Sequence, residues 1–452
     1  MNSNKLGARK WTVLVLFGLI GQIAWTIENM YLNVFMYKTI TTEPSAIAWM
    51  VALSAAVATL ATILMGALSD KLGKRKIFMS VGYIIWGLSI VTFAFISKDN
   101  VSLLFPNAKV ATIVTVTVAL MILLDCVMTY IGSTANDATF YAWVNDATNE
   151  HNRGGAEGLL ATMPLIGMLV VFGALDFLTK SGNWLAFFGI VGGVVTISGI
   201  VGLFLVKDEA KPKEGNYWKD IIYGFTPKNI KNNWLLYVIF SAVCVLGIAQ
   251  QVFIPYFIIY FEQYIGILDY ALLLGGILIL ASLISFVAGL LVNKFGKKFL
   301  LIPSTIIYVL GMLALFFLGL YLKDNMTLTI ILTLICGTLM MGAYLAALVP
   351  LNALARDVMP KGRAGAFSGV RMVFFVLIPM IVGPFIGSTI IENGGAGQFV
   401  GDMGVEYIPI PHIFLAGSII AIFTFIPIYF ILRTNISKYQ MSRNETNLSN
   451  EN

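Results

Sequence analysis

The sequence predicts an all-α membrane protein of twelve transmembrane helices, arranged as two six-helix halves. The chain of 452 residues is 58% hydrophobic and only 12% charged, with a mean hydropathy of +0.85. A soluble protein of this size would leave large apolar patches in contact with water. Long apolar runs give the number of helices, and an internal repeat gives their grouping.

The apolar runs are each long enough to cross a bilayer, which takes about 20 residues. They lack the alternation of a membrane barrel, so we expect no strands. Six runs come before a polar stretch and six come after it: Thr12–Met36, Ala46–Ser69, Ile77–Ser97, Thr112–Trp143, Ala156–Leu178 and Trp184–Val206, then Trp234–Tyr260, Tyr270–Val292, Lys298–Tyr321, Thr327–Leu354, Ala366–Ile390 and Pro411–Leu432.

The domain boundaries follow from these runs. Residues 1–206 form the N-terminal half, 207–233 a cytoplasmic linker, and 234–432 the C-terminal half. Residues 433–452 are rich in Asn and Ser and predict a disordered cytoplasmic tail.

The distribution of Lys and Arg predicts the orientation. With the N-terminus inside, 23 of the 29 basic residues fall in inside segments, five fall outside, and Arg371 lies within a helix. Basic residues favour the cytoplasmic side, so we expect a multi-pass protein of the plasma or inner membrane with both termini cytoplasmic. This asymmetry also explains the net charge of +6 without a nucleic-acid partner.

An internal repeat relates the two halves. The segment from Gly66 to Arg75, with Asp70 and Gly73, recurs as Gly289 to Lys298, after the second helix of each half. A second pair follows the fourth helix of each half: Asn145-Asp146 with Arg153, against Arg356-Asp357 with Arg363. Duplicated halves of this kind are typical of secondary transporters.

The segment Gly66-x-x-x-Asp70-x-x-Gly73-Lys74-Arg75 resembles the signature loop of the major facilitator superfamily. The resemblance implies the major facilitator fold and transport by alternating access. Around helix four, Tyr130, Asp137 and the Phe140–Trp143 stretch are similar to the glycoside–pentoside–hexuronide:cation symporters, as is Asp357-Val with Lys361-Gly-Arg363. That narrower resemblance implies a sugar or glycoside carried with a cation.

One departure from this narrower family affects the coupling ion. The two carboxylates that the family carries in helix two fall here on Ala58 and Thr62. The family's cation site is therefore incomplete, and a neighbouring branch, nearer the sucrose-type proton-coupled carriers, is an alternative. A proton needs only one buried carboxyl group, so we expect proton coupling, or simple facilitated diffusion, rather than Na⁺ coupling, and no other cofactor.

Polar side chains inside the apolar runs are the candidate binding and coupling residues, because charges within membrane helices are rare and costly. In helix one, Gln22, Thr26, Asn29 and Asn33 share a helical face, whereas Glu28 points about 100° away from Asn29. We expect this face to line a solute or water path. Hydrogen bonding between helices, and a Glu28 that faces a neighbouring helix, stay open as alternatives.

The other candidates lie in helices four, seven and eleven. Helix four offers Asp125 and Asn136 on one face and Asp137 with Tyr141 on the adjacent one; helix seven offers Gln250, Gln251 and Tyr256. Arg371 in helix eleven is a candidate to hold an anion, although an ion pair with Asp357 or Asp137 is an equal alternative. Six charges at cytoplasmic helix ends predict gating roles: Asp70, Arg75, Asp146, Arg153, Asp357 and Arg363.

These features favour a cation-coupled transporter of a small polar solute, working as a monomer in the lipid bilayer. The two histidines and three cysteines match no metal pattern, and no phosphate-binding loop suggests direct use of ATP. No catalytic cluster indicates an enzyme. An exporter or carrier of lipids or amphipaths is the first alternative, and a membrane sensor is the second.

Overall fold

The computed structural model describes residues 6–149, 151–208, 223–322, 325–360, 364–395, 397–401, 404–436 and 439. Twelve helices in this part of the chain are long and apolar enough to cross a membrane, as the sequence predicts. The predicted tail beyond residue 439, most of the linker and Arg363 lie outside the described residues.

The N-terminal half contains the first six spans. Their elements are α1 (Ala8–Thr26), η1 (Ile27–Tyr31) and α2 (Leu32–Thr39); α3 (Pro44–Leu72); α4 (Arg75–Thr92) with η2 (Phe93–Phe95); α6 (Val110–Gly132), η3 (Ser133–Phe140) and α7 (Tyr141–Ala147); α8 (Arg153–Ala174); and α10 (Trp184–Leu205). Two short helices, α5 (Lys98–Leu104) and α9 (Asp176–Lys180), lie between spans.

The C-terminal half contains the remaining six spans after the short linker helix α12 (Pro227–Asn232). Their elements are α13 (Trp234–Gln251), η4 (Ile254–Tyr256), α14 (Phe257–Ile259) and η5 (Tyr260–Ile265); α15 (Tyr270–Phe295); α16 (Leu301–Tyr321); α17 (Met326–Val358); α18 (Ala364–Met372), η6 (Val373–Leu377) and α19 (Ile378–Asn393); and α20 (His412–Ile422) with α21 (Phe425–Arg433).

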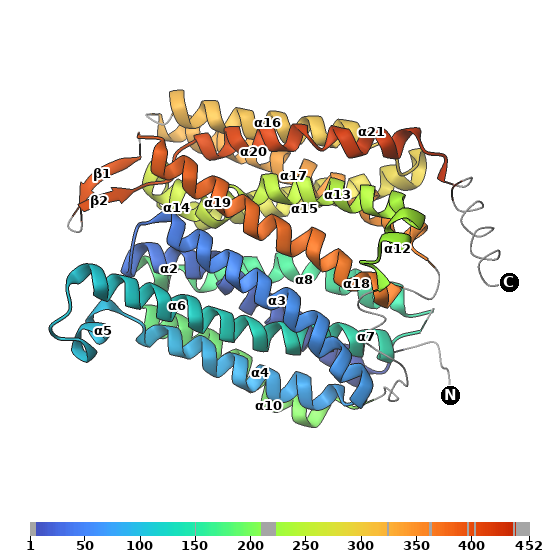
Figure 1. The fold of residues 1–452 in the computed structure, drawn as a ribbon, viewed down its shortest axis with the longest axis horizontal. Coiled ribbons are helices and arrows are strands. Elements are labelled where there is room, and N and C mark those ends of the chain that lie inside the picture. Colours follow the sequence, from blue (N-terminus) through green and yellow to red (C-terminus); the bar gives the residue numbers. More distant parts are fainter. Residues whose placement is uncertain are drawn as a thin grey trace.

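A two-stranded hairpin is the exception to the all-α prediction. Strands β1 (Gln398–Gly401) and β2 (Gly404–Tyr407) pair antiparallel, with Gln398 opposite Tyr407. The hairpin and α5 lie at one end of the bundle, and α7 and α12 lie at the other (Figure 1). We call the hairpin end the outer end and the opposite one the inner end, following the predicted orientation.

Helix boundaries follow from local chemistry. Pro44 begins α3, where its missing N–H would have no helical partner. Gly73 ends that helix with a φ of 63°, a conformation that favours glycine. Asn183 caps α10 by accepting a hydrogen bond from the backbone N–H of Ala186. Such signals mark the start of α3 and α10 and the end of α3.

Four spans contain a π-helical segment: η1, η3, η5 and η6. A π-helix places one extra residue in a turn, and such segments are frequent at functional sites. The extra residue shifts the phase of the helical faces on its two sides. The segments η1 and η3 contain Glu28 and Asp137, both predicted candidates.

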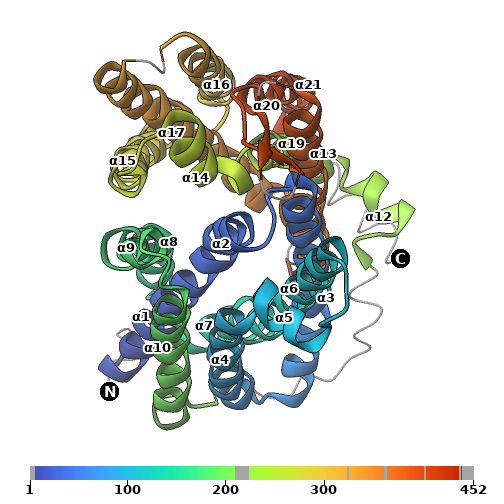
Figure 2. The ribbon, with the colours of Figure 1, turned by 90° about the vertical axis from the view of Figure 1, so that its left-hand side faces the viewer.

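The two halves lie side by side, as the view onto the outer end shows (Figure 2). Helices pack closely within each half; between α4 and α10, a Cβ on Gly87 would lie 2.4 Å from the carbonyl oxygen of Gly192. Large apolar side chains such as Leu60, Leu123 and Phe286 are exposed on the flanks. These flanks are suited to contact with lipid, because their exposed side chains have no hydrogen-bonding needs.

Candidate functional site

A cavity of about 210 Å³ lies between the two halves. Both halves contribute to its wall, through η1, α3, α6 and α8 on one side and α13, η4, α14, α15, α17 and α19 on the other. The lining residues are Glu28, Asn29, Met30, Met50, Val51, Ser54, Asp125, Met168, Phe172, Gln250, Gln251, Ile254, Pro255, Phe257, Leu274, Ile277, Leu278, Met341 and Met380. Sites of secondary transporters lie at such an interface between repeats.

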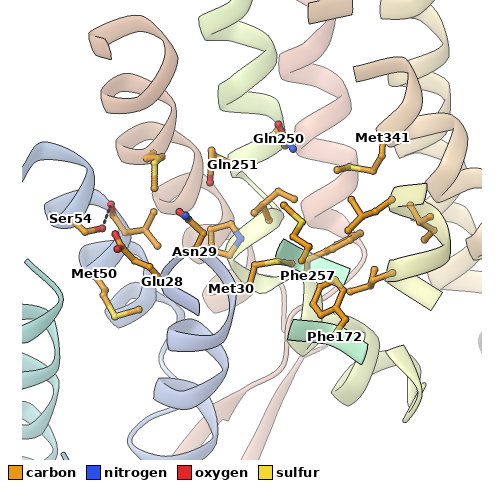
Figure 3. A pocket seen from close by; sticks show the side chains of 18 of the residues that line it. Glu28, Asn29, Met30, Met50, Ser54, Phe172, Gln250, Gln251, Phe257 and Met341 are labelled. Atoms are coloured by element: carbon orange, nitrogen blue, oxygen red, sulfur yellow. Dashed lines mark hydrogen bonds between the residues drawn. The ribbon is translucent and has the colours of Figure 1, made fainter. Parts of the chain in front are cut away.

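The wall has a polar end and an apolar end. Glu28 and Ser54 lie at one end of the close-up view, and Phe172 and Met341 lie at the other (Figure 3). Three amide side chains, from Asn29, Gln250 and Gln251, complete the uncharged polar part, and most of the remaining wall is aliphatic, aromatic or methionine. Such a wall suits a small solute that has a polar part and an apolar part.

Glu28 and Asp125 bring negative charge to this cavity. Thr129, one turn after Asp125 on α6, donates a hydrogen bond of 2.7 Å to Oε1 of Glu28. The other oxygen of Glu28, Oε2, and Oδ1 of Asp125 are buried without a hydrogen-bond partner in the described structure. The side chains are almost fully buried, with Glu28 7% and Asp125 1% exposed. Two carboxyl groups therefore line the same cavity, and the hydrogen bond from Thr129 fixes the position of one of them, Glu28.

The predicted face of helix one is only partly correct. Asn29 lines the cavity, but Asn33 is fully buried and donates a hydrogen bond to the carbonyl oxygen of Asn29. Gln22 lies outside the lining, where its backbone packs against Gly167. Glu28 both lines the cavity and contacts a neighbouring helix, so the two alternatives are combined. The π-helical segment η1 explains this outcome, because it breaks the uniform spacing on which the predicted face rested.

In the fourth span, only Asp125 among the predicted residues lines the cavity. Asn136 is buried against Trp25 and Tyr83, with a hydrogen bond of 2.6 Å to the Tyr83 hydroxyl, so it joins helices within one half. Asp137 accepts a hydrogen bond of 3.2 Å from Ser133, one turn earlier. These contacts place Asn136 in the packing of the half, and Asp137, its neighbour in η3, likewise lies outside the cavity lining.

Three further candidates lie away from the cavity. Tyr256 is buried, and its hydroxyl donates to the carbonyl oxygens of Pro44 and Pro384 at 3.1 and 3.0 Å, which joins the halves near the outer end. Arg371 and Tyr141 are exposed toward the inner end, with the Arg371 guanidinium 4.9 Å from the Phe375 ring. No ion pair of Arg371 is found in the described part of the chain. The predicted pairs with Asp357 and Asp137 are therefore wrong for this conformation.

The charges predicted as gates form separate groups at the inner end. Arg75, only 2% exposed, forms ion pairs with Asp70 and, at 3.0 Å, with Asp146. Asp357 forms an ion pair of 2.5 Å with Lys297. Arg153 instead donates to the Thr148 hydroxyl and to the backbone at Asn145. These ion pairs each join elements of one half.

The outer end contains polar contacts between the halves that the sequence interpretation missed. Lys38 of the first span forms an ion pair of 2.6 Å with Glu262 of the seventh. Asp176, 3% exposed, accepts hydrogen bonds from Tyr31 at 2.9 Å and from Tyr270 of the other half at 2.7 Å. Glu262 lies just beyond the predicted apolar run, and Asp176 near a run's end. The sequence did contain one signal for this contact, because the first span of each half has a charged residue at its outer end, Lys38 and Glu262.

The outer end is therefore closed in this structure. The hairpin adds to the closure, since the Tyr37 hydroxyl donates to the carbonyl oxygen of Tyr407 at 2.8 Å. Trp49 and Phe385, from opposite halves, pack with their ring centroids 4.9 Å apart. At the inner end, Tyr141 is 39% exposed. The ion pair and the tyrosine hydrogen bonds between the halves described above lie at the outer end.

Comparison with known proteins agrees with this architecture. The profile of the Major Facilitator Superfamily matches residues 14–384. A bacterial homologue of the human lysosomal transporter Spinster, in an inward-facing and unoccupied conformation, is similar with a TM-score of 0.63 and 18% identity, covering 96% of this chain and 98% of that one. The partially occluded inward-open xylose transporter XylE from E. coli gives a TM-score of 0.62 and 16% identity, covering 92% and 97%. A search of curated proteins gave no match.

Proposed function

Because this chain belongs to the major facilitator superfamily, we propose that it is a proton-coupled secondary transporter for a small solute with a polar and an apolar part. One observation carries the proposal: the cavity between the halves holds two buried carboxyl groups and a largely apolar wall. Transport then follows by alternating access, with the cavity open to one side at a time.

The carboxyl pair supports proton coupling. Two ionised carboxylates in one enclosed space are costly, because they repel each other and have lost their hydration. Loading a proton or a positive charge removes part of this cost and makes closure of the cavity more favourable. Protons are the preferred coupling ion over Na⁺, since the helix-two positions of the sodium-linked family are occupied by Ala58 and Thr62.

The solute class follows from the lining. A sugar or glycoside, which the narrower resemblance implies, finds amide partners in Asn29, Gln250 and Gln251. The apolar end suits a glycoside with an apolar group better than a free sugar, whose hydroxyls need more partners than this wall offers. The same apolar end also suits an amphipathic solute, and therefore supports the alternative of an exporter of amphipaths. Sugars, glycosides and amphipaths therefore belong in one test panel.

The test uses the full chain in proteoliposomes, with labelled solutes and imposed proton or Na⁺ gradients. We expect solute movement to follow the proton gradient. Glu28→Gln should abolish gradient-driven accumulation while solute exchange at equal pH continues, because the amide keeps the size of a protonated carboxyl group. Glu157→Gln, an exposed position outside the cavity, is the matched control. Movement that follows Na⁺ and ignores pH would contradict proton coupling.

Asp137 provides a second arm of the same experiment. Its carboxyl group lies outside the cavity lining and accepts a hydrogen bond from Ser133, and we assign it the exchange of protons with the inner side. We expect Asp137→Asn to lose gradient-driven accumulation as well. Normal accumulation in this variant, with loss in Glu28→Gln, would assign the coupling to the cavity pair alone.

We also propose that the protein is a monomer in the cell membrane with both termini cytoplasmic. A complete cavity within one chain and the Lys and Arg distribution support this arrangement. A reporter fused after Val206 or at Asn452 should be cytoplasmic, and one inserted in Gly394–Tyr407 should be external. An external reporter at Asn452 would contradict the orientation.

A further inference from the structure

We infer that Glu28 and Asp125 together bind the charged group of an organic monocation, a protonated or quaternary amine with an apolar body, in exchange for protons. The inference rests on the proposed function, of which it specifies the solute. It also replaces symport with exchange, because the solute and the proton compete for the same carboxyl groups.

The first support is the free capacity of the pair. Oε2 of Glu28 and Oδ1 of Asp125 are buried, line the same cavity and have no hydrogen-bond partner among the described residues. The single bond from Thr129 to Oε1 of Glu28 satisfies one oxygen only. A buried carboxylate oxygen without a partner costs free energy, so the native structure keeps two such atoms only where a ligand or proton can satisfy them.

The second support is the missing positive charge. The nineteen lining residues, all in the described part of the chain, include no Lys, Arg or His. Neither carboxylate is within ion-pair distance of a described basic side chain; Lys38 is taken by Glu262 at the outer end. The pair therefore offers an unbalanced negative charge to whatever enters. A neutral solute would leave that charge uncompensated, whereas a monocation balances one carboxylate.

The third support is the apolar part of the wall. Phe172 and Phe257 present aromatic rings, and Met30, Met168 and Met341 present flexible, polarisable side chains. Aromatic rings attract ammonium groups and also pack against apolar groups, and methionine adapts to bodies of different shape. An inorganic cation would contact only the acidic end of the cavity. It would also need several oxygen ligands, whereas an organic ammonium group needs only a carboxylate to balance its charge.

Other titratable groups around the pair are few. Asp137 lies close enough to Glu28 to add to the negative field, and Cys126 follows Asp125 in the sequence. The parts of α3, α8, α13, α15, α17 and α19 that line the cavity contribute no charged side chain. Proton uptake within the cavity is therefore confined to Glu28 and Asp125, and a fixed positive charge that enters must displace protons from them.

The test compares two probes of the same shape: phenethyl-trimethylammonium, whose charge does not depend on pH, and its uncharged carbon analogue with a tert-butyl group. Binding to the purified full chain is measured by calorimetry at several pH values and in buffers of different ionisation enthalpy. We expect the ammonium probe to bind at least tenfold more tightly than the analogue. Its affinity should increase with pH, and binding should release protons.

The variants separate recognition from folding. Glu28→Gln and Asp125→Asn should each weaken ammonium binding at least tenfold, without changing binding of the uncharged analogue, which also confirms that the cavity is intact. Glu157→Gln and Asp99→Asn, both exposed, should have no effect. Equal binding of the two probes, or unchanged ammonium binding in both cavity variants, would overturn the inference.

Transport distinguishes this inference from the function on which it rests. In proteoliposomes, an outward movement of the ammonium probe should drive proton movement in the opposite direction. If the probe fails but a glycoside of the panel moves with protons in a Glu28-dependent way, the inference is wrong and the proposed function stands. If no solute in the panel responds to a proton gradient, the proposed function itself is contradicted.

Discussion

At the outer end of the bundle, polar contacts join the two halves, whereas the inner-end ion pairs between described residues each join elements of the same half. Lys38–Glu262 and Tyr270–Asp176 belong to the first kind, and Arg75–Asp146 and Lys297–Asp357 to the second. In a carrier that alternates between two openings, contacts between halves must break when their side opens, and contacts within a half can persist. The outer contacts therefore set the conformational balance, and the inner clusters preserve each half.

The largest effect should come from the buried inner cluster. Arg75 is 2% exposed and bonds Asp70, Asp146 and Ser69, so Arg75→Gln removes a buried charge from two half-buried carboxylates and leaves them without that counter-charge. We expect a loss of about 3 kcal/mol in stability, as for other buried ion pairs that lose one partner. Thermal unfolding in detergent measures it, with the exposed Lys74→Gln as control. Equal unfolding temperatures in the two variants would contradict the assignment.

The outer bridge should change the conformational balance more than the stability. Lys38→Met leaves Glu262, 12% exposed, without its ion-pair partner. We expect the outward-open population to rise roughly tenfold, since an unsatisfied buried group costs about 1–3 kcal/mol in the closed form.

Spin labels at Leu103 and Tyr321, exposed near the outer ends of opposite halves, report this opening as a longer distance. The native cysteines Cys126, Cys244 and Cys336 are first replaced. Lys109→Met, an exposed lysine at the start of α6, is the matched control. An unchanged distance distribution in Lys38→Met would show that the bridge does not hold the outer end closed.

A smaller effect is expected for Asp70→Asn. Asp70 contacts Arg75 at the inner end and lies outside the cavity, and Asp146 still pairs with Arg75 in the variant. We expect transport to slow a few-fold, an effect of about 1 kcal/mol on the cycle, while solute binding is retained. Calorimetry on the purified variant checks binding, and vesicle flux checks the rate. Loss of binding in a folded variant would place Asp70 in the solute site instead.

The smallest effect belongs to the exposed pair of the C-terminal half. Lys297 and Asp357 are 38% and 36% exposed, so solvent and salt screen their attraction. We expect Lys297→Gln to cost about 0–1 kcal/mol of stability. The contrast with Arg75→Gln is the measurable quantity, because both residues lie in the repeated segment, in which Lys297 matches Lys74 and Lys298 matches Arg75. A loss in Lys297→Gln as large as that in Arg75→Gln would remove the difference between the halves.

The sequence predicted the spans well because bilayer spanning leaves a strong and simple signal. All twelve apolar runs coincide with helices, and the observed ends differ from the predicted ones by a few residues in either direction. The run Thr12–Met36 lies within Ala8–Thr39, whereas the run Ile77–Ser97 ends earlier, at Phe95. The repeat also identified the inner clusters of Asp70, Arg75 and Asp146. The hairpin at Gln398–Tyr407 escaped prediction because its two strands of four residues are too short to carry a clear periodic signal.

Within the site, residue type was predictable and position was less so. Glu28, Asn29, Asp125, Gln250 and Gln251 were identified as polar groups in apolar helices, and all five line the cavity. The apolar lining could not be told from lipid-facing or core positions of the same composition, as Phe172 and Met341 illustrate. Contacts between halves, such as Tyr270 with Asp176, depend on tertiary placement that spacing within one helix does not contain.

The π-helical turn around Glu28 also bears on how the cavity could lose its charge without any proton moving. If η1 gave up its extra residue and became regular α-helix, one side of the first span would turn by about 100° relative to the other. Ile27 or Asn29 would then occupy the place that the carboxylate holds now. The first span would in that way present either an acidic or a neutral wall to its solute, while every backbone N–H merely exchanged one carbonyl partner for the next.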